Sequence, residues 1–190
     1  MRIQWCLILS VCVLAVLASC GGPPKPDGAP EDKNDEVGVR AMELTSDGAR
    51  FKIGPLPTGW RRLQELGGGE AKAAFTNRAN DQAIMVNVSY APNRRAGLIA
   101  LRNHLLFDIT DRKILEQSEI EVDKREGLWT VCTGYLDGAP IKMALVVARI
   151  DNWVYDLAYI SPPSQFEHNL KDFKDFVKTL HQRRQDQEKE

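Results

Sequence analysis

Imidazole and thiol groups are the side chains best suited to metal binding or nucleophilic catalysis, and this sequence has few of them. Its histidines are His104, His168 and His181. A zinc site needs ligands at short spacings, and none of these three has another His or Cys within four residues. No G-x-S-x-G segment presents a serine nucleophile either. We therefore expect solvent-exposed histidines, no catalytic residue, no metal site and no cofactor.

A second group of ionisable side chains is acidic and lies on one predicted strand. Glu119, Glu121 and Asp123 alternate with Ile120 and Val122. Such alternation is typical of a strand with a solvent-facing side at the edge of a sheet. The alternative is a pair of catalytic carboxylates, which would have to face each other across a substrate. We expect the edge strand, with a further carboxylate from Glu116 on the same strand.

The N-terminal segment predicts export from the cytoplasm. Residues 1–4 carry one positive charge, the 13 residues Trp5 to Leu17 are apolar, and small residues precede Cys20. This order is typical of a secretory signal. A transmembrane helix needs about 20 apolar residues, and the segment Gly21 to Pro24 cannot extend a helix. We expect a cleaved signal peptide covering residues 1–19 and no retained span.

Leu17-Ala18-Ser19-Cys20 resembles the lipobox of bacterial lipoproteins. The resemblance implies that the Cys20 thiol is diacylated and that cleavage makes Cys20 the new N-terminus. Diacylation together with an acyl chain on the new amino terminus exceeds the two lipid signals that stable anchoring requires. Residue 21 is Gly, whereas Asp after the lipidated Cys resembles the signal that retains Gram-negative lipoproteins at the inner membrane. We therefore expect the outer membrane, facing the periplasm. The alternative is an ordinary signal peptide with a chance Cys.

Processing at Cys20 would leave 171 of the 190 residues, and loss of Arg2 would change the formal charge from −1 to −2. This charge gives no indication of nucleic-acid binding. Cys6 and Cys12 leave with the signal, so Cys132 is the one free thiol and no intramolecular disulfide can form. We expect Cys132 to be a small buried apolar side chain; the alternative is a redox-sensitive thiol.

Composition divides the remaining chain into three parts. Residues 20–48 are rich in Pro, Gly and acidic side chains, which predicts a disordered tether with a mean span of about 30 Å. Residues 49–181 show regular hydrophobic patterns and form the predicted folded domain. Residues 182–190 are a polar tail.

The hydrophobic patterns of the domain predict three strands, a helix, four strands and a closing helix. Asp137-Gly138 and Asp151-Asn152 fit two-residue hairpin turns. Ser164 and Glu167 fit a capping box for the last helix. The predicted strands cover residues 51–53, 71–77, 82–92, 113–122, 128–136, 139–150 and 153–160, and the predicted helices begin near residues 93 and 164.

This order of elements resembles the PsbP-like superfamily, as do the segments PLPTGW (Pro55 to Trp60) and NWVYDLAYISPPSQFEHNLKDF (Asn152 to Phe173). The resemblance implies an α+β domain in which an antiparallel sheet of about six to seven strands is flanked by two helices, an α/β/α sandwich. It brings no catalytic motif with it. It implies a binding or accessory role.

The two hairpin turns also predict which side chains share a face of the sheet. One face carries Trp129, Val131, Tyr135, Ala144, Val146, Ala148, Trp153, Tyr155, Leu157 and Tyr159. The other carries Cys132, Ile141, Met143, Leu145, Val147, Val154, Asp156 and Ile160. The aromatic face predicts either a helix packed over the two alanines or an open groove for a lipid-like ligand or a partner helix. Its candidate contact residues are Trp129, Tyr135, Trp153 and Tyr155.

Together these features predict a lipid-anchored protein of the cell envelope that acts as a non-enzymatic accessory or binding module. Its expected partners are the membrane, through acylated Cys20, and another envelope protein, with no nucleic acid. The first alternative is a carrier or sensor of an apolar small molecule or lipid bound on the aromatic face. An enzyme of unrecognised type is the next alternative, and the missing nucleophile, base and metal ligands disfavour it.

Overall fold

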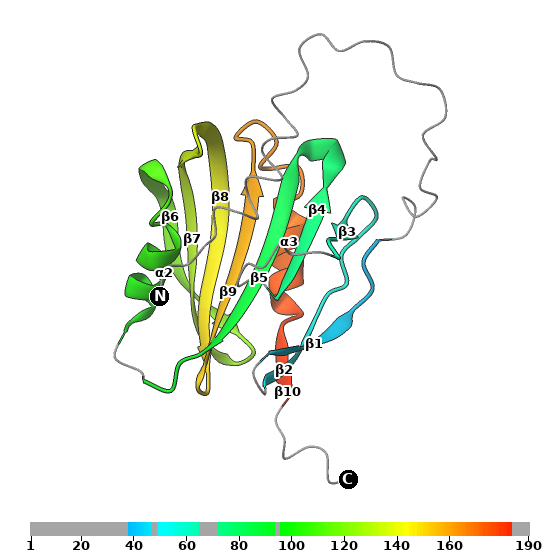
Figure 1. Ribbon diagram of the computed structural model, residues 1–190, viewed down its shortest axis with the longest axis vertical. Helices are drawn as coiled ribbons and strands as arrows, with labels where there is room; N and C mark the ends of the chain where they lie inside the picture. Colours follow the sequence, from blue (N-terminus) through cyan, green and yellow to red (C-terminus); the bar gives the residue numbers. More distant parts are fainter. Residues whose placement is uncertain (1–37, 47–48, 65–71, 94–95, 184–190) are drawn as a thin grey trace.

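A computed structural model describes residues 38–46, 49–64, 72–93 and 96–183 (Figure 1). In chain order its elements are β1 (Met42–Ser46), β2 (Ala49–Ile53), β3 (Arg61–Arg62), β4 (Ala73–Asn77), the 3-10 helix η2 (Arg78–Asn80), β5 (Gln82–Tyr90), α2 (Leu98–Leu105), β6 (Thr110–Val122), β7 (Arg125–Leu136), β8 (Ala139–Ile150), β9 (Trp153–Ser161), α3 (Leu170–Lys178) and β10 (His181–Arg183).

Seven of these strands form the main sheet, in the order β3-β4-β5-β9-β8-β7-β6. Every neighbouring pair in it is antiparallel. A smaller antiparallel sheet has the order β1-β2-β10. The predicted fold class, an α+β domain whose antiparallel sheet of six to seven strands is flanked by two helices, is confirmed.

Three tight hairpins set the register of the long strands. Trp129 lies opposite Val146, and Ala148 lies opposite Tyr155, so both predicted turns are confirmed. The turn residues Asp137, Gly138 and Asp151 have positive φ of 49°, 81° and 53°, the backbone conformation that two-residue hairpins require. A third hairpin, between β6 and β7, turns at Asp123 and Lys124, which also have positive φ.

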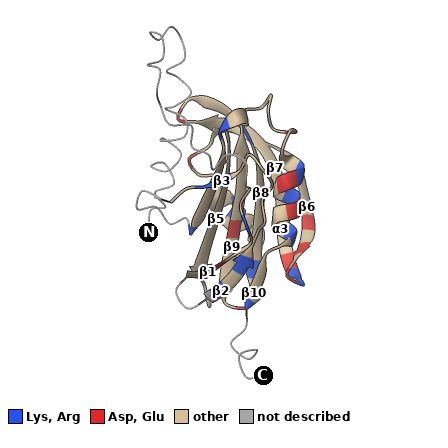
Figure 2. Ribbon diagram, turned by 90° about the vertical axis from the view of Figure 1, so that its right-hand side faces the viewer, with Lys and Arg blue, Asp and Glu red and all other residues tan. Residues whose placement is uncertain are grey.

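The two helices cover opposite faces of the main sheet, which gives the α/β/α layering. Helix α2 packs against β7 and β8, and Leu106, directly after it, joins a buried cluster with Cys132 and Met143. Helix α3 packs on the other face, where Phe173 and Tyr159 belong to the second cluster. In Figure 1, α3 lies behind the sheet, and Figure 2 shows the layers from the side. We call these surfaces the α2 face and the α3 face.

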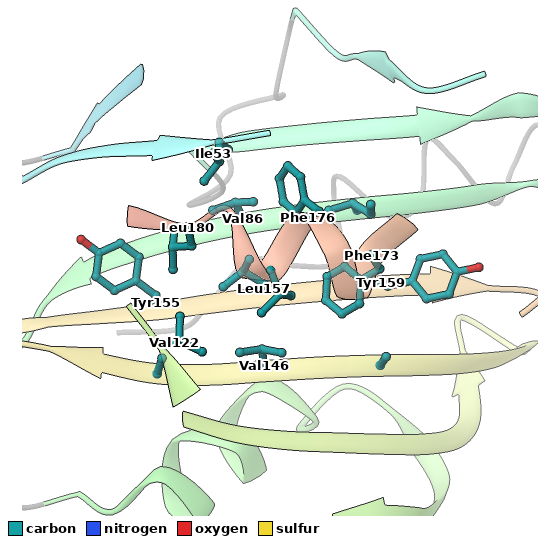
Figure 3. Close-up of a cluster of buried hydrophobic side chains, with 14 of the residues drawn as sticks. Ile53, Val86, Val122, Val146, Tyr155, Leu157, Tyr159, Phe173, Phe176 and Leu180 are labelled. Carbon is teal, nitrogen blue, oxygen red and sulfur yellow. The ribbon is translucent and has the colours of Figure 1, made fainter. Parts of the chain in front are cut away.

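Helix α3 forms because its apolar residues recur every three or four positions and can all face the sheet. Phe173, Phe176 and Val177 are buried there. Figure 3 shows Phe173 and Phe176 in this cluster. The helix begins later than expected, with Asn169 at its N-cap and no side-chain capping bond. The capping box of Ser164 and Glu167 is therefore wrong.

Helix α2 is shorter than its apolar pattern suggests. It runs from Leu98, not from near residue 93, and ends at Leu105. Ile109 follows a turn and packs where Gly134 leaves space, since a Cβ on Gly134 would lie 2.4 Å from the Ile109 Cγ2. Leu101, Leu105 and Ile109 recur at four-residue spacing, which predicts one helical face, but Ile109 lies beyond the end of the helix.

The small sheet extends the folded domain beyond both predicted limits of residues 49–181. Strand β1 lies inside the segment 20–48 that was expected to be a tether, and β10 overlaps the start of the expected polar tail 182–190. Both strands pair with β2. The sequence does carry a hairpin signal for β1 that the prediction missed, because Asp47-Gly48 stands between Ser46 and Ala49, which lie opposite each other. Strand β10 is polar and has no such signal. The rest of the tether, up to residue 37, and of the tail, from residue 184, lies outside the described residues.

Candidate functional site

Trp129 and Tyr155, two of the four candidate contact residues, lie in the core. The Trp129 ring sits 6.0 Å from the Phe173 ring, and the Lys174 Nζ lies 5.3 Å from its centroid. Tyr155 is 0% exposed and meets Phe51 edge to face at 5.6 Å. Neither side chain is available to a partner on the folded domain.

Tyr135 and Trp153 remain accessible, but at opposite ends of the sheet. Tyr135 lies next to the β7–β8 turn, and its side chain is 44% exposed. Trp153 lies next to the β8–β9 turn, where its ring packs 4.9 Å from the half-exposed ring of Tyr90. The structure therefore does not bring the four aromatic residues together as one contact surface.

Helix α3, together with β2 and the loop that carries Trp60, fills the aromatic face of the sheet. Tyr159 is the centre of this packing, with the Phe173 ring stacked at 5.7 Å and the Trp60 and Phe166 rings at 6.4 and 5.3 Å. Its hydroxyl donates a hydrogen bond to the Phe166 carbonyl oxygen at 2.8 Å, and burial raises the pKa of Tyr159 to about 12. Of the two alternatives for this face, the packed helix is the arrangement observed. The open aromatic groove is wrong, so the carrier hypothesis has no site there.

Two surface hollows lie elsewhere, and charged side chains line both. The first, of about 420 Å³, lies between the start of α2 and the strand ends that carry Arg125 and Arg149. The second, of about 360 Å³, lies beside Glu119, Glu121 and Glu126. Neither is lined by an aromatic residue. An apolar ligand would have to displace the water that solvates these charges, which disfavours it at either hollow.

Cys132 is fully buried on the α2 face. Burial raises the pKa of its thiol to about 11, although the charges of Arg102 and Arg112 act in the opposite direction. The strand pattern around Cys132 did not predict these two cations, because they come from α2 and β6. Arg102 is itself 6% exposed, its Nη1 lies 3.5 Å from the Thr130 Oγ1, and desolvation lowers its pKa. A buried, protonated thiol is poorly suited to redox sensing.

The histidines form no metal site with the described residues. His104 and His168 are exposed, as expected. His181 differs, because its Nδ1 lies 2.5 Å from the Asp123 Oδ1, whose other oxygen accepts the Gln182 backbone N–H at 3.1 Å. The described part of the chain holds no group of three His, Cys, Asp or Glu side chains that could bind a metal ion. The His181–Asp123 pair joins β10 to the β6–β7 turn and so has a structural role.

The main unpartnered surface of the described domain is the outer edge of the sheet at β6. This strand pairs with β7 on one side, and its residues from Thr110 to Glu119 are exposed. The predicted edge strand is therefore confirmed for Glu116, Glu119 and Glu121. Asp123 differs from the prediction, because it lies in the β6–β7 turn and its side chain, in contact with His181, is only 10% exposed. The strand is longer than expected, because it starts at Thr110 instead of residue 113.

Large exposed apolar side chains gather at the first half of this strand. Six such side chains occur among the described residues, and four of them lie on β6 or beside it: Phe107 at 80% exposure, Leu115 at 49%, Tyr135 at 44% and Ile114 at 39%. Tyr135 belongs here because it lies opposite Thr110. The sequence pattern missed this grouping, since Phe107 and Tyr135 are far apart along the chain. We call Thr110–Val122 with Phe107 and Tyr135 the β6 edge.

Cys20 lies outside the described residues, so the structure does not test lipidation. No helix in the described part of the chain is long and apolar enough to cross a membrane.

Neither a protein-family profile nor a curated protein matches this sequence. Solved structures do match its fold. LpqN of Mycobacterium tuberculosis, a protein involved in cell envelope biogenesis, has a TM-score of 0.59 at 12% identity, over 84% of this chain and 100% of that one. Cyanobacterial PsbP (CyanoP) of Synechocystis has a TM-score of 0.54 at 13% identity, over 87% and 98%.

This domain has the PsbP-like fold. The expected resemblance is confirmed at the level of architecture. At such low identity the two matches establish the arrangement of elements only, because one fold carries many functions. In this PsbP-like domain the β6 edge is the surface that combines an unpaired strand with grouped, exposed apolar side chains.

Proposed function

We propose that this protein is a lipid-anchored, non-enzymatic binding module of the bacterial cell envelope. In this proposal the acylated Cys20 holds the chain at the membrane, and the Pro- and Gly-rich segment after it spaces the PsbP-like domain from the bilayer. The domain then binds another envelope protein through the β6 edge. Gly21 favours the outer membrane, on its periplasmic side.

The observation that carries the binding role is the contrast between a filled core and an exposed sheet edge. Both faces of the sheet are covered by helices, and the aromatic side chains pack against α3. The β6 edge instead leaves backbone groups and four large apolar side chains accessible. Grouped exposed apolar side chains of this kind typically mark interaction sites.

Support for the envelope comes from the N-terminal sequence and from one structural neighbour. The lipobox resemblance at Leu17 to Cys20 provides an anchor, and LpqN, which shares this fold, is involved in cell envelope biogenesis. Support for a non-enzymatic role comes from the chemistry of the described site residues. The buried thiol of Cys132 is protonated, and the imidazole of His181 contacts a carboxylate but no described nucleophile.

One experiment tests the anchor and the partner together. The tagged full-length protein and its Cys20→Ser variant are expressed in their own envelope, and the membranes are fractionated and cross-linked. We expect the wild-type protein in the outer-membrane fraction with a diacylated N-terminal Cys20, and one reproducible cross-linked protein. Cys20→Ser should leave the membrane, remain unprocessed or both, and lose that cross-link. Unchanged processing and membrane association of the variant would overturn the anchor, and the absence of any cross-linked protein would overturn the binding role.

A further inference from the structure

We infer that the β6 edge binds an extended, basic segment of the partner by strand addition. The partner segment would pair with the backbone of β6 and place Lys or Arg side chains beside its glutamates. This inference rests on the proposed binding role and names the chemistry of the partner. It is carried by three observations: a free backbone edge, a row of carboxylates along it, and apolar side chains at one end.

The first observation is the free backbone edge. β6 is the last strand of the seven-stranded sheet and pairs with β7 alone. In an antiparallel pair, alternate residues direct their N–H and C=O groups away from the partner strand. Among the described residues, these outward groups of β6 have no strand to pair with, which makes the edge a template for a further strand. The opposite edge, β3, is only two residues long and offers no such template.

The free edge is regular over its second half. Register shifts in the β6–β7 pairing occur between Thr110 and Lys113 and between Ile114 and Glu116. From Glu116 to Val122 the pairing with β7 is uninterrupted. Irregularities of this kind disrupt a ladder and are a common protection of edge strands. The stretch from Glu116 to Val122 is therefore the part of β6 best shaped to accept a strand, with a length of about 24 Å.

The second observation is the charge along this regular stretch. Glu119 lies opposite Leu128, and Glu121 lies opposite Glu126, which places these carboxylates on the α2 face. Glu116 lies on the α3 face, opposite Val131. Figure 2 shows the acidic residues along β6. Like charges directly across a strand pair destabilise the sheet, so Glu121 and Glu126 repel each other when no cation is near.

The cations nearest to these carboxylates do not neutralise them all. Arg125, on β7, forms an ion pair of 3.3 Å with Asp151 in the β8–β9 turn. Lys124 lies in the turn and is exposed. A partner strand with Lys or Arg at alternate positions would reach Glu119 and Glu121 from the same face. Opposite charges at such positions stabilise the pairing, which favours a basic segment over a neutral one.

The third observation is the apolar end of the edge. Ile114, Leu115 and Tyr135 are partly exposed beyond the acidic stretch, and Phe107 is almost fully exposed. These side chains would contact apolar residues of a partner segment that continues past its basic part. The β6 edge thus has an acidic half and an apolar half, and the matching segment is basic in one half and apolar in the other.

A second copy of this chain is a poorer occupant of the same edge. Antiparallel pairing of β6 with β6 in the register that opposes Glu119 and Glu121 would place a glutamate across from a glutamate twice. Like charges across a strand pair are destabilising. The acidic half therefore disfavours self-association while it attracts a basic strand.

Peptide binding to the lipidated protein in detergent tests this inference. The probe is a fluorescent peptide of alternating lysine and valine that ends in two leucines. One control peptide has glutamate in place of lysine, and another has proline in place of valine, which prevents strand pairing. We expect the basic peptide alone to raise the fluorescence anisotropy, with an affinity that falls as salt is added.

A pair of charge-reversal variants locates the site. Glu119→Lys with Glu121→Lys should weaken peptide binding by about tenfold or more, since two attractions become repulsions. The matched control is Glu167→Lys with Asp175→Lys, which changes the net charge equally at the exposed surface near α3. It should retain binding. Equal loss in both variants, equal binding of the proline peptide, or no binding of the basic peptide would overturn strand addition.

Site-specific cross-linking separates this inference from the proposed function. A photoreactive residue is placed at Ser118, on β6, or at Arg62, on the opposite edge strand. Capture of the envelope partner from Ser118 and not from Arg62 is the expected result. Capture from Arg62 alone would overturn the β6 edge as the docking site while leaving the binding role intact, and capture from neither would overturn both.

Discussion

The side-chain oxygen of Gln182 accepts a hydrogen bond from the hydroxyl of Tyr155 across 3.0 Å, although 27 positions separate the two residues. Both side chains are buried. Gln182 belongs to β10, and its backbone N–H is donated to Asp123 in the β6–β7 turn. The C-terminal strand is thus part of the fold at three points: its pairing with β2, the core tyrosine and the hairpin turn.

Substitution of Gln182 should destabilise the domain. Gln182→Ala leaves the buried hydroxyl of Tyr155 without its acceptor, which costs about 1–3 kcal/mol in the free energy of unfolding. Arg183→Ala is the control, because the 3.4 Å ion pair of Arg183 with Glu43 is partly exposed. The control should lie within about 1 kcal/mol of wild type. Urea unfolding measures both, and equal stability of the Gln182→Ala and wild-type proteins would contradict the role of β10.

The docking of α3 on the aromatic face should depend on Phe173. This ring is 0% exposed and contacts both Trp129 and Tyr159. Phe173→Ala removes a large buried side chain and should lower the free energy of unfolding by about 3–5 kcal/mol. Phe107→Ala is the matched control at the surface and should change it by no more than about 0.5 kcal/mol. Similar effects of the two substitutions would show that the core is not packed as described.

The hydrogen bond from the Trp60 Nε1 to the Asp172 Oδ2, 3.0 Å long, joins the loop before β3 to α3. Trp60 is buried, so Asp172→Ala should leave an unsatisfied N–H and destabilise the domain by about 1–3 kcal/mol. Asp172→Asn keeps an acceptor oxygen and should retain most of the stability. Thermal or urea unfolding of the three proteins checks this order, and the hypothesis fails when the Asn and Ala variants are equally unstable.

Stability should fall at alkaline pH, partly through Cys132. Burial raises the pKa of this thiol to about 11 in the folded protein, while an unfolded chain releases the proton near 8.5–9. The unfolded state therefore ionises first, and the stabilisation present below about pH 9 is lost as pH rises toward about 11, with a slope of up to about 1.4 kcal/mol per pH unit.

Cys132→Ala isolates this contribution, because Tyr155 and Tyr159 also have raised pKa values and remain in the variant. The variant should show a smaller loss of stability between pH 9 and pH 11 than wild type does. Urea unfolding at a series of pH values measures the difference. An identical pH dependence of the two proteins would show that the thiol of Cys132 ionises at an ordinary pH in the folded state.

Local features of the sequence were enough to predict the long hairpins and the exposed acidic edge, but not which sheet each strand joins: the predicted strand 51–53 belongs to the small sheet, and β3 was not predicted. Asp137-Gly138 and Asp151-Asn152 specify their turns because few residues tolerate positive φ. The alternation of Glu119 and Glu121 with Ile120 and Val122 is a property of one strand and needs no other element. The aromatic stripe of α3 likewise follows from helical spacing within a single segment.

Tertiary structure decided everything that depends on residues distant in the chain. It buried Trp129 against Phe173 of α3 and Tyr155 against Phe51 of β2, although a strand pattern alone allowed an open groove. It joined His181 to Asp123 across 58 positions, and it grouped Phe107 with Tyr135 beside β6. Periodicity and turn chemistry are local, so they specify elements; which elements meet depends on the total apolar surface that the folded chain can bury.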